Sequence, residues 1–164
     1  MNSSDTKTWT INISKKDVFF DIDLLSLYYS EVSAGDAPVK ADRIATETAK
    51  ESQTRIFTRL CDHRMSDIRQ LLEKFIRAVE TPTSTGSDTL DTSTNWQIRI
   101  RITEEAEDNT LATIADFIHD YLVSGALADY YAQIGQQGNR ESLNLRAQND
   151  YERIRELIYY RPMP

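Results

Sequence analysis

The feature that most constrains this chain is a pair of short segments that alternate apolar and polar residues in the same order. Residues 95–103 read NWQIRIRIT and residues 8–13 read TWTINI, so the pattern Trp-x-Ile-x-Ile occurs twice. Strict alternation over this length is typical of a β-strand that buries one face. We therefore expect residues 8–13 and 96–103 to pair as a two-stranded antiparallel ribbon.

Pairing of the two segments places their apolar side chains on one buried face and two arginines, Arg99 and Arg101, on the other. The buried face comprises Trp9, Ile11, Ile13, Trp96, Ile98, Ile100 and Ile102. A two-stranded ribbon is only marginally stable in water, and its outer edges expose backbone N–H and C=O groups. The ribbon must lean on helices or be extended by strands of a neighbouring subunit, and the second alternative predicts an oligomer.

Helices are predicted for most of the remaining chain. The first is expected at about residues 15–33, because Ser14 and Asp17 have the spacing of a capping box. Residues 40–80 contain no Gly or Pro and keep apolar residues on one face, which predicts one long helix or two in sequence. If there are two helices, the break falls near residues 61–67, where Ser66 can cap the second helix.

Two more helices are predicted in the C-terminal half. One is expected at about residues 110–135, capped by Asp108 or Asn109 and ended by Gly135. Its apolar residues cover more than one narrow stripe, as expected for a helix at the centre of a bundle or between subunits. The other, at about 140–160, is amphipathic. The predicted fold class is therefore mainly α, a four- to five-helix bundle with an inserted β-ribbon.

Composition limits the classes of function. The 164 residues suit a single domain, 1–164, with a polar mobile loop at 81–95 and an extended C-terminal tail at 161–164. A net charge of −7 argues against generic affinity for nucleic acids or anionic lipids. No apolar run reaches the length of a bilayer span and the N-terminus lacks the order of a signal peptide, so we expect a soluble protein made inside the cell.

The strongest candidate for catalysis or metal binding is a set of three polar residues on one predicted helix. Asp116, His119 and Asp120 fall on one helical face. No second histidine lies nearby, and metal sites in bundles draw carboxylates from several helices, so the preferred interpretation is a solvated pair with His119 titrating near neutrality. The single cysteine, Cys61, is expected to be a buried apolar residue. We predict no enzymatic activity, catalytic residue, metal or cofactor.

Adjacent tyrosines indicate an interface, because one member of each pair must face away from the core side of its helix. The pairs are Tyr28/Tyr29, Tyr130/Tyr131 and Tyr159/Tyr160. Core packing with a polar tip is the alternative for any one of them, while Tyr and Arg are enriched in interface cores. The candidate interface residues are Trp9, Trp96, Arg99, Arg101, Tyr130, Tyr159, Tyr160, Arg161, Pro162 and Met163.

A longer pattern covers roughly the last third of the chain. Residues 117–162 read FIHDYLVSGALADYYAQIGQQGNRESLNLRAQNDYERIRELIYYRP, a Tyr- and Ala-rich helix, a turn with Gly, and an amphipathic helix that ends in aromatic-Arg. In pattern, this part resembles the C-terminal half of small head-to-tail connector proteins, the neck adaptors of tailed bacteriophages and prophages. The resemblance implies a structural virion protein built as a helical bundle, with a β excursion in some members.

The same resemblance implies a ring of copies, often twelve, beneath the portal protein in the virion neck, assembled in the host cytoplasm. Other neck or tail proteins would be partners, and DNA would pass through without specific binding. The loop 81–95 would order against a neighbour, the ribbon would pair between subunits, and the tail 161–164 would dock on the portal. The N-terminal half matches no family motif, which leaves open a tail completion or terminator protein, or a non-viral cytosolic helical regulator.

Overall fold

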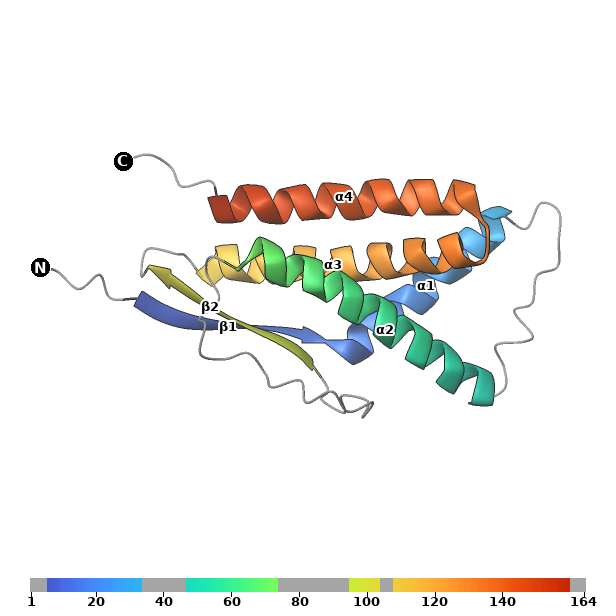
Figure 1. Ribbon diagram of the computed structural model, residues 1–164, viewed down its shortest axis with the longest axis horizontal. Coiled ribbons are helices and arrows are strands. Elements are labelled where there is room, and N and C mark those ends of the chain that lie inside the picture. Colours follow the sequence, from blue (N-terminus) through green and yellow to red (C-terminus); the bar gives the residue numbers. More distant parts are fainter. Residues whose placement is uncertain (1–5, 34–46, 74–94, 104–107, 160–164) are drawn as a thin grey trace, which may run out of the picture.

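The computed structural model describes residues 6–33, 47–73, 95–103 and 108–159 of the chain. The elements in chain order are β1 (Thr6–Ser14), α1 (Lys15–Ser33), α2 (Glu47–Leu71), β2 (Asn95–Thr103), α3 (Asp108–Gln133) and α4 (Gln137–Tyr159). In the described part of the chain, four helices accompany one two-stranded antiparallel sheet (Figure 1). The predicted fold class, a mainly α bundle with an inserted ribbon, is confirmed.

The ribbon has the register that the alternating segments require. Trp9 lies opposite Ile100, and Ile11 lies opposite Ile98. Arg99 and Arg101 are exposed on the outer face. The buried members of the inner face are Ile11, Ile13, Trp96, Ile98 and Ile100, with Trp9 partly buried. The prediction for the two faces of the ribbon is confirmed for these side chains, and both strands extend slightly beyond the predicted bounds.

Helices support the ribbon, and one tryptophan contacts two of them. The ring of Phe19 in α1 meets the ring of Trp96 edge-on at 6.0 Å. The indole N–H of Trp96 donates a hydrogen bond of 2.8 Å to a carboxylate oxygen of Asp62 in α2. The ammonium group of Lys15 lies 5.2 Å from the centre of the same ring. Of the two alternatives for stabilising the ribbon, contact with helices is therefore present within a single chain.

α1 begins where the capping box was predicted. The backbone N–H of Asp17 donates to the hydroxyl oxygen of Ser14 at 3.3 Å. The bounds of the helix agree with the predicted residues 15–33.

Of the two alternatives, the structure has one continuous helix, α2, through residues 61–67, and the break beside Ser66 is absent. Four apolar residues one turn apart form a single buried stripe, and an interrupted helix would move half of them out of line. They are Cys61, Met65, Ile68 and Leu72. Ser66 caps nothing here: its hydroxyl donates at 3.3 Å to the carbonyl of Asp62 one turn earlier, which is how a serine inside a helix satisfies its hydroxyl. α2 ends at Leu71. The last part of the predicted helix, residues 74–80, lies outside the described residues.

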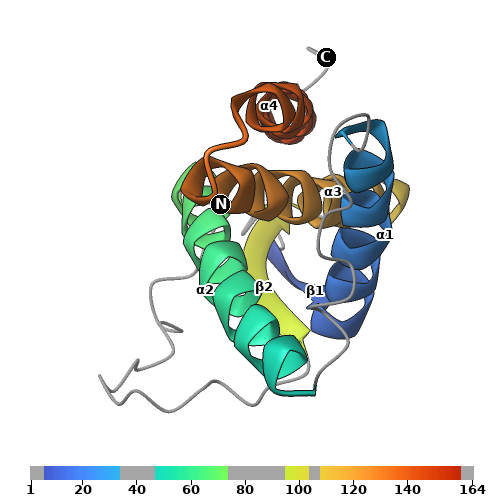
Figure 2. The ribbon, with the colours of Figure 1, turned by 90° about the vertical axis from the view of Figure 1, so that its right-hand side faces the viewer.

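α3 occupies the centre of the molecule (Figure 2). α4 packs on one side of it, and α1, the ribbon and α2 lie on the other side, with α1 and α2 on opposite flanks of the ribbon. Eight consecutive residues, 121–128, are buried, so every side of the helix is covered along this stretch. The prediction that this helix is contacted on several sides is confirmed, and its place is the centre of the bundle.

The turn between α3 and α4 depends on Gly135, as predicted. Gly135 has φ of +79°, a conformation that glycine adopts without steric cost. The N–H of Gln136 donates to the carbonyl of Tyr131 at 3.0 Å, and the N–H of Gly135 donates to the carbonyl of Ala132 at 3.4 Å, which is a Schellman cap. α4 then runs back along α3 (Figure 1) and starts three residues earlier than expected.

Some predicted features lie outside the described residues. These are the tail 161–164 and the loop 81–95, except Asn95, which opens β2.

Candidate interaction surface

The outer side of α1 presents large apolar side chains to solvent. Phe20, Leu24 and Tyr28 follow one another at intervals of four residues and are 62%, 51% and 59% exposed. Leu27 beside them is 54% exposed. We call these four residues the α1 stripe. Their spacing places them along one side of the helix for more than two turns.

The α1 stripe is unusual because the opposite side of the same helix is also apolar. Val18, Ile22 and Tyr29 are buried in the core. A helix with one side in the core normally carries polar residues on the other side. Single exposed apolar residues are common and need no explanation, whereas a contiguous row of them marks an interaction site.

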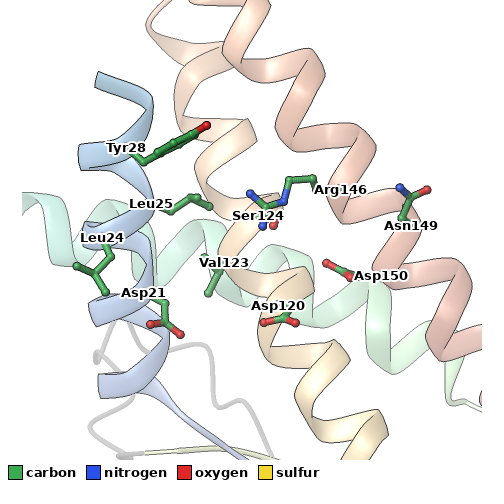
Figure 3. A pocket seen from close by; sticks show the side chains of 10 residues that line it. All are labelled: Asp21, Leu24, Leu25, Tyr28, Asp120, Val123, Ser124, Arg146, Asn149 and Asp150. Carbon is green, nitrogen blue, oxygen red and sulfur yellow. The ribbon is translucent and has the colours of Figure 1, made fainter. Parts of the chain in front are cut away.

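A groove of about 490 Å³ lies beside the α1 stripe, between α1, α3 and α4 (Figure 3). Leu24 and Tyr28 belong to its α1 wall, so the groove and the α1 stripe are continuous. Asp120 of α3, and Asp150 and Arg146 of α4, line the other walls. The groove therefore combines an apolar wall with a charged one.

The charges in the groove are poorly balanced. Burial and, to a smaller extent, the negative charge of Asp120 together raise the pKa of Asp150 to about 6, against the opposing effect of Arg146. Burial also raises the pKa of Asp120, with Asp116 and Asp21 adding to the effect. Raised pKa values of carboxyl groups mean that the anionic forms are disfavoured where they stand. A cation that entered the groove would stabilise the anionic forms of both Asp120 and Asp150.

His119 is held by a residue that the sequence pattern missed. Its Nε2 atom lies 2.6 Å from a carboxylate oxygen of Asp21 in α1. The predicted solvated pair with Asp116 or Asp120 on the same helix is therefore corrected to a contact between two helices. Within the described residues, no group of three or more His, Cys, Asp or Glu side chains is placed to hold a metal ion.

On the other flank of α3, Arg64 of α2 forms a second polar cluster. Its guanidinium group donates two hydrogen bonds, of 2.8 and 2.7 Å, to the two carboxylate oxygens of Asp129. It also donates to the hydroxyl of Tyr121 at 3.4 Å and to the amide oxygen of Asn144 at 3.3 Å. The hydroxyl of Tyr121 in turn donates to Asp67 at 3.1 Å. This cluster, the Arg64 cluster, joins α2, α3 and α4.

Gly125 makes room for the Arg64 cluster. A Cβ atom at this position would lie 2.9 Å from Nε of Arg64, closer than side chains tolerate. Burial lowers the pKa of Arg64, but hydrogen bonds to Asp129 and Tyr121 outweigh burial and raise that pKa above its usual range. Sequence reasoning missed the cluster, although an isolated glycine inside a strongly predicted helix often has a packing reason and was the available signal.

Cys61 has the buried position that was predicted. Its thiol is fully enclosed in the core. Burial, followed by the negative charges of Asp62 and Asp129, raises the pKa of the thiol well above its usual range. The thiol stays protonated at neutral pH, in the state that is a poor nucleophile.

The predicted interface residues lie in different environments. Trp96 is 4% exposed and is a core residue rather than a surface residue. Trp9 is partly buried on the same face of the ribbon, opposite Ile100, and Tyr130 is partly buried with its ring 5.1 Å from that of Phe57. Arg99 and Arg101 are on the exposed outer face of the ribbon.

Two of the tyrosine pairs divide as predicted. Tyr28 is exposed beside buried Tyr29, and Tyr130 is partly exposed beside buried Tyr131. Tyr159 is the last residue of α4. Tyr160, Arg161, Pro162 and Met163 lie outside the described residues.

The α1 stripe was absent from the predicted interface. The core spacing of α1 was recognised in the sequence, but the surplus apolar residues between the core positions, including Phe20 and Leu24, were the signal that was not used. Among the described helices, none has the length and apolarity needed to cross a membrane. Comparison of the chain with protein-family models, with curated proteins and with solved structures finds no match.

Proposed function

We propose that this chain is a structural subunit of the head-to-tail connector of a tailed bacteriophage or prophage. In this role, copies of the chain form a ring beneath the portal protein in the neck of the virion. The proposal assigns the chain an assembly role without catalysis, cofactor or metal. The α1 stripe is the observation that carries it.

The α1 stripe supports an assembly role because its exposure costs free energy that a partner would recover. Fully burying a Leu or Phe side chain contributes about 1.5–3 kcal/mol. Phe20, Leu24 and Tyr28 are half exposed or more, so each would gain part of this free energy from contact with a partner. A chain that works alone gains nothing from keeping these residues outside.

Three further features support the connector role in particular. Residues 117–162 resemble the C-terminal half of the neck adaptors in pattern. β1 and β2 pair only with each other among the described residues, so each keeps an outer edge that a neighbour can approach. The net charge of −7 suits a channel for DNA, because a protein that binds phosphates through many basic residues would hold the duplex.

The test is binding to particles. The purified chain is incubated with portal-bearing capsids that lack a connector, and the number of copies that sediment with each capsid is measured. We expect several copies per portal for the wild type and at least a tenfold weaker affinity for Leu24→Ser. Leu145→Ser is the matched control, because Leu145 is 61% exposed on α4 and is not among the residues that line the groove beside the α1 stripe.

Two results contradict the proposal. If the wild-type chain does not sediment with capsids, the connector role fails. Binding to isolated tails instead would assign a tail completion or terminator role.

A further inference from the structure

The outer face of α2 is basic, in contrast to the surroundings of the α1 stripe. Arg55, Arg59 and His63 are exposed along one side of this helix, and so is Asp62, whose carboxylate accepts a hydrogen bond from Trp96; the two arginines outweigh this single carboxylate. Ile56, 39% exposed, lies beside them. We call Arg55, Ile56, Arg59 and His63 the α2 basic face.

The margins of the α1 stripe are acidic. Asp17 and Asp23 are exposed on either side of it, and Asp21 lies partly exposed beside Leu24. Lys16 is the basic residue that adjoins the stripe among the described side chains. The α1 stripe and the α2 basic face are therefore opposite in charge.

The two surfaces lie on opposite flanks of the molecule. Figure 2 shows α1 on one side of the ribbon and α2 on the other. The α1 stripe and the α2 basic face thus cannot meet within one chain, and each copy offers one of each.

We propose that the α1 stripe of one copy docks on the α2 basic face of a second copy. This contact joins two different surfaces. A copy that docks through its α1 stripe still has its α2 basic face available for a further copy. Repetition of such a contact builds a ring when the rotation between copies closes, and a filament when it does not. The inference rests on the proposed function, to which it adds the surface that receives the α1 stripe.

The chemistry of the two surfaces is complementary. The aliphatic stems of Arg55 and Arg59 cover apolar surface while their guanidinium groups stay available for charge pairing. The aromatic rings of Phe20 and Tyr28 attract such cations on their faces. The acidic groove continues the stripe through Leu24 and Tyr28, so it offers carboxylates to the same arginines.

Charge also argues against the simplest alternative, in which the α1 stripes of two copies meet each other. Such a contact would bring Asp17, Asp21 and Asp23 of both copies to one interface. Like charges facing each other oppose association. Docking on the α2 basic face replaces this repulsion by attraction.

The experiment reverses the charge of each surface separately. Asp17→Lys with Asp23→Lys makes the margins of the α1 stripe basic, and Arg55→Glu with Arg59→Glu makes the α2 face acidic. All four residues are exposed, so the fold should persist, and circular dichroism with the thermal midpoint checks this. Self-association is measured by sedimentation velocity over a concentration series, free and in the presence of portal-bearing capsids.

We expect each reversed variant alone to associate at least tenfold more weakly than the wild type, because its two surfaces then carry the same sign. An equimolar mixture of the two variants should associate again, since copies that alternate along the row present opposite charges at every contact. Unchanged association of the Arg55→Glu, Arg59→Glu variant would overturn the inference and favour contact between two α1 stripes. A wild-type chain that associates under neither condition would overturn it as well.

Failure of this inference is distinguishable from failure of the connector role. If self-association responds to the charge reversals as expected but the chain does not bind capsids, the contact between copies is supported and the connector role is contradicted. If several copies bind each capsid and neither charge reversal weakens this binding, the connector role is supported and the proposed contact between copies is contradicted.

Discussion

Charged side chains lie partly buried on both flanks of α3, and the two flanks differ in how well those charges are matched. On the α2 flank, Arg64 meets both carboxylate oxygens of Asp129 at hydrogen-bond distance. On the α1 flank, Asp120 and Asp150 face a groove in which Arg146 only partly offsets their charges. The first flank is satisfied within the chain, whereas the second has an excess of negative charge beside exposed apolar residues.

The difference indicates that the Arg64 cluster holds the fold, whereas the groove beside the α1 stripe meets a partner. A fully satisfied polar cluster fixes the positions of the helices that contribute to it. A cluster with excess negative charge is stabilised by an added positive charge, and another molecule can supply that charge. We therefore expect changes to the Arg64 cluster to act mainly on stability, and changes to the α1 stripe to act mainly on association.

Among the changes to polar contacts, the largest expected effect on stability is that of Arg64→Ala. Removing the guanidinium group leaves Asp129 partly buried without its two hydrogen bonds, at a cost of about 2–3 kcal/mol in the free energy of unfolding. Urea denaturation measures the change. The matched control is Arg59→Ala on the exposed side of the same helix, for which we expect a change within about 0.5 kcal/mol. Equal effects of the two substitutions would mean that the Arg64 cluster contributes nothing.

Gly125→Ala should lower the free energy of unfolding by about 1 kcal/mol, because the new methyl group displaces Arg64 from its partners. The same substitution made together with Arg64→Ala should instead be neutral or stabilising, since alanine favours a helix over glycine by about 1 kcal/mol. A double-mutant cycle in urea measures this change of sign. Additive effects of the two substitutions would contradict the close approach of Arg64 to α3.

Asp150→Asn should stabilise the fold near neutral pH. The pKa of Asp150 in the folded chain, about 6, lies above its ordinary value of 3.8. The folded state therefore holds more protons between these two values, so the contribution of this residue to stability is present at low pH and is lost as pH rises through 6. With the substitution, we expect a gain on the order of 1 kcal/mol at pH 7, after allowance for solvent screening, and no gain below pH 4.

Thermal unfolding of wild type and Asp150→Asn across this pH range measures the effect. Glu141→Gln, at an exposed position of the same helix, is the control and should shift neither curve. A stability difference that does not depend on pH would contradict the electrostatic origin.

The smallest expected effect on stability is that of Leu24→Ser, within about 0.5 kcal/mol, because this side chain is mostly in water. Ile22→Ala in the same helix is the contrasting change, and at this buried position we expect a loss of about 2–4 kcal/mol. Urea denaturation compares the two. A large loss of stability for Leu24→Ser would mean that the α1 stripe stabilises the fold and is not reserved for a partner.

Much of the fold followed from local patterns in the sequence. The two Trp-x-Ile-x-Ile segments were sufficient for the pairing and the faces of the ribbon, because a period of two determines which side chains share a face. Gly135 marked the end of α3, since its left-handed conformation favours glycine. At Ser66 the local capping signal was misleading, because the buried stripe through Cys61 and Ile68 favours one continuous helix.

The polar contacts could not be predicted in the same way. Asp21 and His119 are 98 residues apart, and Arg64 and Asp129 are 65 apart. Such pairs depend on how the helices pack in three dimensions, and a periodic pattern along the chain does not predict them. The exposure of the α1 stripe has the same origin, because the sequence shows a helix apolar on two sides without showing which side is covered.

The measurement that tests the central claim most directly is the mass of the chain by light scattering, alone and after mixing with a purified portal protein. The account predicts a complex whose mass requires several copies of the chain per portal ring. A chain whose mass stays that of a monomer under both conditions would contradict it.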